Sequence, residues 1–351
     1  MRIRAIILSI PLLLAPPLLA RDKTDVMVMK NGDRMTCQIK GLDAGVLYVS
    51  FDYIDGTSSV DWSKVASLQS KELFIVKTQD GSLYMGALTA AETAAGRPVK
   101  LQVVETPEKE IAIEQSQVVQ MVQTSEKFWQ RFNGEITFGI IYSKGNQSTQ
   151  YNLASQTAYV RERWNAKAAL SSSLSSSSGT NASTRNSLGL SALHYLPWND
   201  WFYSGIGTFL QSSEQGINRQ STFGAGIGRY LKNTNRASIS VLGGAAWVKT
   251  NYQPSIVPVG VQNVASALIV ADVRLFRFSK SNLSATAHIL PALSEPGRVR
   301  FDTDTSYYIK LFGNLSWNLS FYGNWDNRPP PGLSGTDYGT SSGLSWTFGL
   351  K

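Results

Sequence analysis

The stretch GLSWTFGL, residues 343–350 near the end of the chain, alternates apolar and small polar residues with a period of two. In an extended strand Leu344, Trp346 and Phe348 lie on one face, and the residues between them lie on the other. This alternation predicts a β-strand with one apolar and one polar face.

The same alternation recurs upstream in segments of about 10–15 residues, longer than the 5 or 6 residues usual in a soluble sandwich. In one of them Leu315, Trp317, Leu319 and Phe321 face one way, and the polar residues between them face the other. A tilted strand needs about 9–11 residues to cross a bilayer, with its apolar side toward lipid. We therefore predict an all-β chain with a C-terminal transmembrane antiparallel β-barrel over residues 127–351.

The alternating segments number about twelve, and an even number is expected of a bacterial barrel. The predicted strands begin near Glu135, Gln150, Trp164, Arg185, Trp201, Gln220, Ala237, Asn263, Asn282, Arg298, Asn314 and Tyr338.

The predicted connections alternate in length. The short ones are residues 161–163, 197–200, 232–236, 279–281 and 312–313. The longer ones include residues 177–183, 252–262 and 326–335. Such barrels have short periplasmic turns and longer outer loops, so this alternation predicts that both barrel ends face the periplasm.

Aromatic residues cluster beside the short turns, as expected of an interfacial girdle. They are Trp164, Trp198, Trp201, Phe276, Phe278, Phe312 and Trp317.

The start of the chain has the features of a secretory signal peptide over residues 1–20. Arg2 and Arg4 precede an apolar run, and Ala20 offers a small residue for cleavage. No other apolar run approaches 18 residues, so we predict no transmembrane helix.

Composition excludes several classes of protein. The 351 residues contain one cysteine, Cys37, and two histidines, which argues against a disulfide scaffold and a structural zinc site. Charged residues make up 17% and aromatic residues 11%, a balance that fits neither a disordered chain nor a coiled coil. We expect no cofactor and no metal.

Charge divides the chain near residues 124–127. Residues 21–126 carry 11 basic and 15 acidic residues, whereas residues 127–351 carry 20 basic and 10 acidic residues. The basic residues are scattered rather than striped, so we predict no nucleic-acid binding.

The segment at residues 21–126, here called the N-terminal module, looks duplicated. Hairpin signals occur at Asn31-Gly32 and Asp80-Gly81, and type I′ turns would need positive φ at both central residues. The spacing predicts two small SH3-like β-units in the periplasm, residues 21–71 and 72–126. We expect Trp62 to lie in the core and the module to bind a periplasmic protein or the cell wall.

Two stretches of the barrel segment carry a family resemblance. Residues 134–146, GEITFGIIYSKGN, and residues 336–348, TDYGTSSGLSWTF, resemble the bacterial outer-membrane family called domain of unknown function 481, also labelled salt-induced outer membrane proteins. The resemblance covers residues 128–351. It implies an outer-membrane barrel in contact with lipid and the barrel assembly machinery, and it implies no activity. Lys351 departs from the aromatic end of an outer-membrane signal.

Candidate catalytic groups are few, and we predict that the chain is not an enzyme. The glycine-rich residues 224–228 lie within a predicted strand and open no helix, so they do not fit a dinucleotide loop. A lipid hydrolase remains an alternative, but neither His194 nor His288 has a convincing carboxylate or amide partner in the sequence.

The polar face of the predicted strands supplies the candidate site, a narrow lumen. Its charges are mixed, so they form either a salt-bridge network that plugs the barrel or the wall of a passage for small hydrophilic solutes. The candidate lumen residues are Asp272, Arg274, His288, Arg300, Asp302, Asp304, Tyr308, Lys310, Asn318 and Tyr322.

Overall fold

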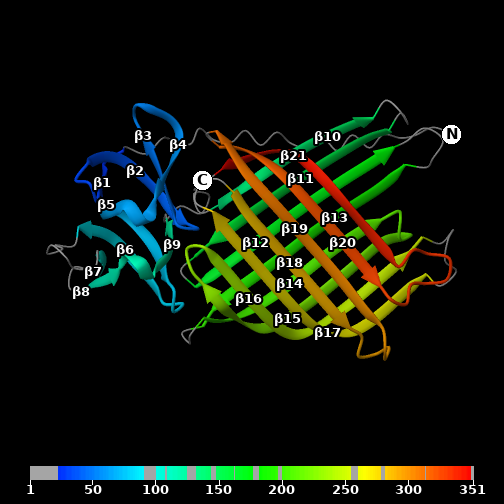
Figure 1. Ribbon diagram of the computed structural model, residues 1–351. Coiled ribbons are helices and arrows are strands. Elements are labelled where there is room, and N and C mark those ends of the chain that lie inside the picture. The colour runs from blue at the N-terminus through cyan, green and yellow to red at the C-terminus, as the bar shows by residue number, and fades with distance from the viewer. Residues whose placement is uncertain are drawn as a thin grey trace.

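The computed structural model contains a β-rich N-terminal module beside a larger β-barrel (Figure 1). The signal peptide predicted at residues 1–20 lies outside the described residues, as do Trp198, Phe278 and Lys351. The structure describes residues 23–90, 100–106, 109–124, 132–143, 148–161, 163–176, 182–196, 200–253, 260–277, 281–312 and 314–348.

Twelve antiparallel strands in sequence order form the closed barrel. Closure joins the last strand to the first, with Gly134 opposite Phe348 and Phe138 opposite Leu344. The strands are β10 (Phe132–Ser143), β11 (Ser148–Val160), β12 (Trp164–Ser176), β13 (Ser183–Tyr195), β14 (Trp201–Ser212), β15 (Ile217–Asn233), β16 (Ala237–Tyr252), β17 (Val261–Arg277), β18 (Ser281–Pro291), β19 (Val299–Phe312), β20 (Leu315–Asp326) and β21 (Thr336–Phe348).

The prediction of twelve strands is confirmed, and each strand begins within three residues of its predicted start. The chain enters the barrel at Phe132 and leaves it at Phe348, on the side of the short connections. We call this side the short-turn end and the opposite side the long-loop end. The N-terminal module lies beside the short-turn end (Figure 1).

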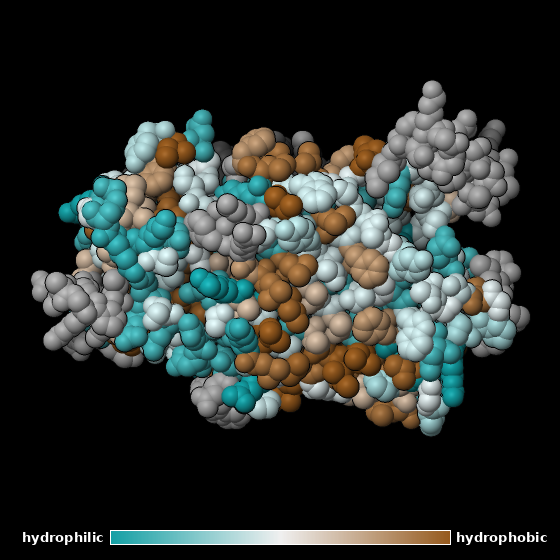
Figure 2. All heavy atoms as spheres, viewed as in Figure 1, coloured by the Kyte–Doolittle hydropathy of each residue, from teal (hydrophilic) through white to brown (hydrophobic). Residues whose placement is uncertain are grey.

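Apolar side chains face outward from the barrel wall. Phe138, Leu170, Leu344 and Trp346 are exposed large hydrophobic residues, although each lies within a fully paired strand. Figure 2 shows apolar residues over the middle of the barrel, with hydrophilic residues over the module and toward the long-loop end. This arrangement fits an apolar band in contact with lipid.

The N-terminal module has nine strands in one sheet, which runs β4-β3-β2-β1-β5-β6-β7-β8, with β9 paired to β2 and β5. Two short 3₁₀ helices, η1 (Trp62–Lys64) and η2 (Gln115–Gln117), lie between them. The strands are β1 (Asp25–Met29), β2 (Arg34–Asp43), β3 (Val46–Phe51), β4 (Ile54–Asp61), β5 (Val65–Thr78), β6 (Leu83–Ala90), β7 (Lys100–Thr106), β8 (Lys109–Glu114) and β9 (Val118–Gln123).

The two predicted hairpin turns share one geometry. Gly32 N donates to Met29 O at 2.9 Å, and Gly81 N donates to Thr78 O at 3.0 Å. The expectation of type I′ turns is wrong, because φ is positive at the glycine (93° and 82°) but not at the residue before it. In each hairpin only the glycine has a positive φ. A turn that ends in one such left-handed residue is also a common connection between twisted antiparallel strands.

The module has one continuous core. The 14-residue strand β5 crosses the predicted boundary between residues 71 and 72, and it pairs with β1, β6 and β9. Trp62 is 5% exposed, as expected of a core residue, and its indole Nε1 donates to Gln115 O at 2.9 Å. The two halves therefore share a sheet and an interior.

Candidate functional site

The ten candidate lumen residues all lie on the inward face of β17 to β20. Cross-strand partners share a face, and the register pairs His288 with Asp302, Asp304 with Tyr322, and Tyr308 with Asn318. Residues of the opposite parity, such as Leu311 and Leu319, are exposed outward.

Several polar contacts cross the lumen between strands that are not neighbours. The Tyr308 hydroxyl of β19 donates to Glu135 Oε1 of β10 at 2.6 Å. Arg185 of β13 pairs with Asp337 of β21 at 3.0 Å and stacks over the Tyr322 ring at 4.2 Å. Glu135, Arg185 and Asp337 were absent from the predicted set, although their inward parity in β10, β13 and β21 could have identified them.

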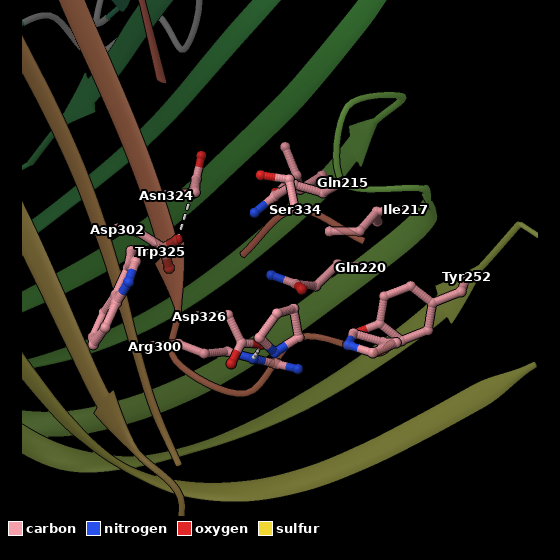
Figure 3. Close-up of a pocket in the computed structure, with 13 residues that line it drawn as sticks. Gln215, Ile217, Gln220, Tyr252, Arg300, Asp302, Asn324, Trp325, Asp326 and Ser334 are labelled. Atoms are coloured by element: carbon pink, nitrogen blue, oxygen red, sulfur yellow. Dashed lines mark hydrogen bonds and ion pairs between the residues drawn. The ribbon is translucent and has the colours of Figure 1, made fainter. Parts of the chain in front are cut away.

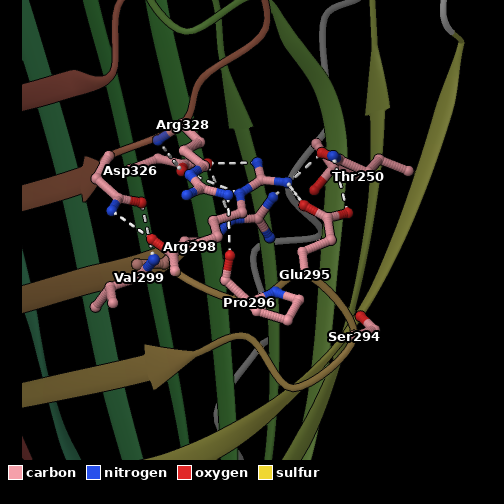
Figure 4. A network of polar contacts seen from close by, with 12 residues as sticks. Thr250, Ser294, Glu295, Pro296, Arg298, Val299, Asp326 and Arg328 are labelled. Atoms are coloured by element: carbon pink, nitrogen blue, oxygen red, sulfur yellow. Dashed lines mark hydrogen bonds and ion pairs between the residues drawn. The ribbon is translucent and has the colours of Figure 1, made fainter.

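A buried ion-pair network holds the long-loop end together (Figure 4). The side chain of Arg298 is 1% exposed and pairs with Glu295 at 2.8 Å and with Asp326 at 2.6 Å. Arg300 Nε also pairs with Asp326, at 3.1 Å. Burial opposes the charged form of Arg298, but hydrogen bonds to Asp326 and Glu295 outweigh it and raise the pKa of this guanidinium. Arg298 lies one residue before β19 and is not in the predicted set, although its parity with Arg300 could have identified it.

A small cavity of about 30 Å³ lies beside this network (Figure 3). Its lining includes Tyr252, Arg300, Asp302 and Asn324. Arg300 Nη1 and Asn324 Oδ1 are buried, and no hydrogen-bond partner for either lies among the described residues. A cavity of this size with unpaired polar atoms has room for ordered water.

Part of the lumen is apolar, which corrects the expectation that its inner face is polar throughout. A buried cluster contains Phe202, Leu242 and Leu268, contributed by β14, β16 and β17. Inward glycines make room for it: a Cβ on Gly226 would lie 2.7 Å from Leu242 Cδ2, and a Cβ on Gly228 would lie 2.5 Å from Phe202 Cζ. The glycine run of β15 therefore has a packing role.

The part of the lumen wall formed by β11 and β12 is polar and exposed. Gln156 and Ser171 face inward by register, with Gln156 opposite Ala169 and Ser171 opposite Ser187. Both residues are nevertheless exposed. The interior therefore combines an apolar wall with a solvated polar wall.

The N-terminal module contacts the short-turn end directly. Lys77 of β5 is 5% exposed, and its Nζ lies 4.2 Å from the ring centroids of Tyr195 and Tyr230. The Gly81 turn meets Asp200, and only a glycine fits there, because its φ is +82° and a Cβ would lie 2.8 Å from Asp200 Oδ1.

Two further contacts join the module to the barrel. Asn235 Nδ2 donates to Val118 O at 2.9 Å, and Lys310 Nζ donates to Ser59 Oγ at 2.7 Å. Lys310, a candidate lumen residue, thus binds the module at the barrel mouth.

The two histidines lie on opposite faces of the wall. His288 faces the lumen by register, whereas His194 shares the outward face with Trp164 and their rings lie 4.5 Å apart.

The prediction that Phe276 belongs to the outer girdle is wrong, because Phe276 lines a cavity between barrel and module. The girdle residues Trp164 and Phe312 are exposed as predicted, at 53% and 71%.

The described residues lack two features, a metal-binding cluster and a membrane-spanning helix. They contain no group of three or more histidine, cysteine, aspartate or glutamate residues that could hold a metal ion. They also contain no helix long and apolar enough to span a bilayer.

The closed barrel, with its apolar outer band and two unequal ends, defines a protein of the outer-membrane β-barrel class. The chain belongs to the family described as "Protein of unknown function, DUF481", whose sequence pattern matches residues 136–348. This match confirms the family predicted from the two quoted stretches.

Solved structures similar to the chain share little sequence with it. The translocator domain of autotransporter NalP from Neisseria meningitidis is 13% identical, with 62% of this chain and 86% of that chain covered and a TM-score of 0.34. The CymD monoaromatic hydrocarbon channel is 10% identical, with 79% and 87% covered and a TM-score of 0.27. CdiB from Acinetobacter baumannii is 9% identical, with 79% and 66% covered and a TM-score of 0.30. No curated protein matches the chain in sequence.

Proposed function

We propose that the chain is an integral outer-membrane barrel with a narrow lumen, capped on the periplasmic side by its own N-terminal module. The apolar outer band supports contact with lipid, and the short-turn end is the side expected to face the periplasm. In this proposal the protein has no catalytic role and needs no cofactor. The barrel assembly machinery would insert it, and the exposed surface of the module would bind a periplasmic protein or the cell wall.

The insertion of Lys77 between Tyr195 and Tyr230 carries this proposal. A lysine that leaves water needs a compensating partner, and two aromatic faces at 4.2 Å provide one. A desolvated cation–π contact contributes about 2 kcal/mol or more. The contact therefore fixes the N-terminal module in direct contact with the barrel mouth at the short-turn end.

A passive channel for small hydrophilic solutes is the second candidate function. The polar wall that includes Gln156 and Ser171 favours it, because these inward residues are exposed and can be solvated. The two candidates differ in whether the docked module blocks passage along this wall.

The cap predicts that the intact protein is electrically silent. In planar bilayers we expect the full chain to show no stable single-channel steps. We expect Lys77→Glu to produce openings, because it replaces the cation between Tyr195 and Tyr230 with a carboxylate that the rings repel.

Lys71→Glu is the matched control, because it makes the same charge change at an exposed module residue. This variant should stay silent. Stable ohmic steps from the unmodified chain would favour the channel and contradict the cap.

A further inference from the structure

A second cavity, of about 120 Å³, lies between the N-terminal module and the barrel mouth. Asp43 and Lys77 of the module line it, together with Lys167, Tyr230 and Arg274 of the barrel. The cavity exists only when the two parts are docked, since each supplies part of the lining.

Positive charge dominates the lining. Lys77, Lys167 and Arg274 are the basic residues, and Asp43 is the one acidic residue among those that line the cavity. Arg274 Nε already pairs with Asp272 at 3.3 Å. Asp272 is therefore a second carboxylate, besides Asp43, that neutralises part of the positive charge. The remaining balance is positive.

Of the three cations that line the cavity, Lys167 has the least compensation of its charge by nearby carboxylates. It interacts electrostatically with Arg274, Lys77, Asp43 and Asp272, and two of these four groups repel it. Within the ranges that the structure describes, no carboxylate oxygen lies within 4.0 Å of its ammonium group. Like charges facing one cavity destabilise each other unless an anion lies between them.

The lining also offers neutral groups that can donate hydrogen bonds. Ser191, which is the cross-strand partner of Lys167, is one of them, and Ser238 is another. Asn233 Nδ2 donates one hydrogen to Asp200 Oδ1 at 3.3 Å and has a second one to offer. Hydrogen bonds from ionised donors to an oxyanion are about twice as strong as neutral ones. A lining of cations and hydroxyls therefore suits a small oxyanion.

We propose that this cavity binds a small free oxyanion of the phosphate, sulfate or carboxylate type, held by Lys167 and Arg274 of the barrel and Lys77 of the module. Because both parts contribute ligands, the bound anion links the module to the barrel mouth. The inference depends on the docked interface and not on whether the barrel conducts.

Thermal unfolding of the full chain in detergent tests this site, with inorganic phosphate as the probe. At constant ionic strength, replacing chloride with millimolar phosphate should raise the melting temperature, because a ligand that binds only the folded state stabilises it. Lys167→Met should abolish this rise and weaken phosphate binding by about tenfold or more. Without phosphate this variant should melt no lower than the unmodified chain, since it removes a repelled cation.

Two controls separate the site from general charge effects. Lys167→Arg keeps the cation and should keep the phosphate response. Lys249→Met removes one positive charge near the long-loop end and should keep it as well. Parallel titrations with sulfate and acetate rank the oxyanions.

Three results would overturn the proposal: an equal stabilisation by chloride, an undiminished phosphate response in Lys167→Met, or no response to any oxyanion. If one of these results were found and the intact protein were electrically silent, the anion site would be wrong but the cap would not be contradicted. The two proposals can therefore fail independently.

Discussion

Asp326→Asn is expected to lower the free energy of unfolding by about 3–5 kcal/mol, because it removes one partner of a buried ion-pair network. Asp326 accepts from Arg298 at 2.6 Å and from Arg300 at 3.1 Å, and the Arg298 side chain is 1% exposed. The variant leaves Arg298 with Glu295 as its remaining carboxylate partner in this network, and it removes the carboxylate that pairs with Arg300. Urea titration followed by heat-modifiable gel migration measures the loss.

Asp52→Asn is the matched control for this prediction. Asp52 pairs with Lys23 at 3.1 Å, but its side chain is 78% exposed, so the same substitution should cost about 1 kcal/mol or less. Equal effects at Asp326 and Asp52 would show that the network at the long-loop end contributes little to stability.

Leu170→Lys should destabilise the barrel by about 2–4 kcal/mol in a lipid bilayer, the cost of a lysine on the lipid face near the midplane. Leu170 lies in the middle of β12, faces outward and is 44% exposed. Folding titrations into lipid vesicles measure the change in free energy.

Ser171→Lys tests the opposite face at almost the same depth. Ser171 faces the solvated wall of the lumen, so a lysine there should change stability by about 0.5 kcal/mol or less. If the two lysine variants were equally stable, the assignment of faces along β12 would be wrong.

The barrel was predictable from the sequence because one physical constraint acts along every strand. A wall with lipid outside and a polar interior alternates with a period of two, so parity alone assigned Asp304, Tyr308 and Asn318 to the lumen face. The closure of β10 on β21 follows from the even number of strands.

The same alternation of apolar and polar residues could not reveal the apolar part of the lumen. In β16 the stretch VLGGAAWV, residues 241–248, is apolar on both faces, so alternation cannot separate lipid from interior. Only the register shows that Leu242 and Val248 face inward while Val241 and Trp247 face outward.

Contacts between distant segments were beyond sequence reasoning. Lys77 and Tyr195 lie more than a hundred residues apart, and neither is part of a recognisable motif. Arg298 lies in a connection rather than a strand, and its burial depends on how residues 292–298 fold back over Asp326. These features set how the lumen is closed, which is why the sequence alone leaves both a plug and a passage as alternatives.

Membrane fractionation tests the central claim, that the apolar outer band contacts outer-membrane lipid, most directly. After expression of the full chain in a Gram-negative host, we expect recovery in the outer-membrane fraction, resistance to extraction by alkaline carbonate, and faster gel migration before heating than after it. Recovery as a soluble periplasmic protein whose migration does not change on heating would contradict it.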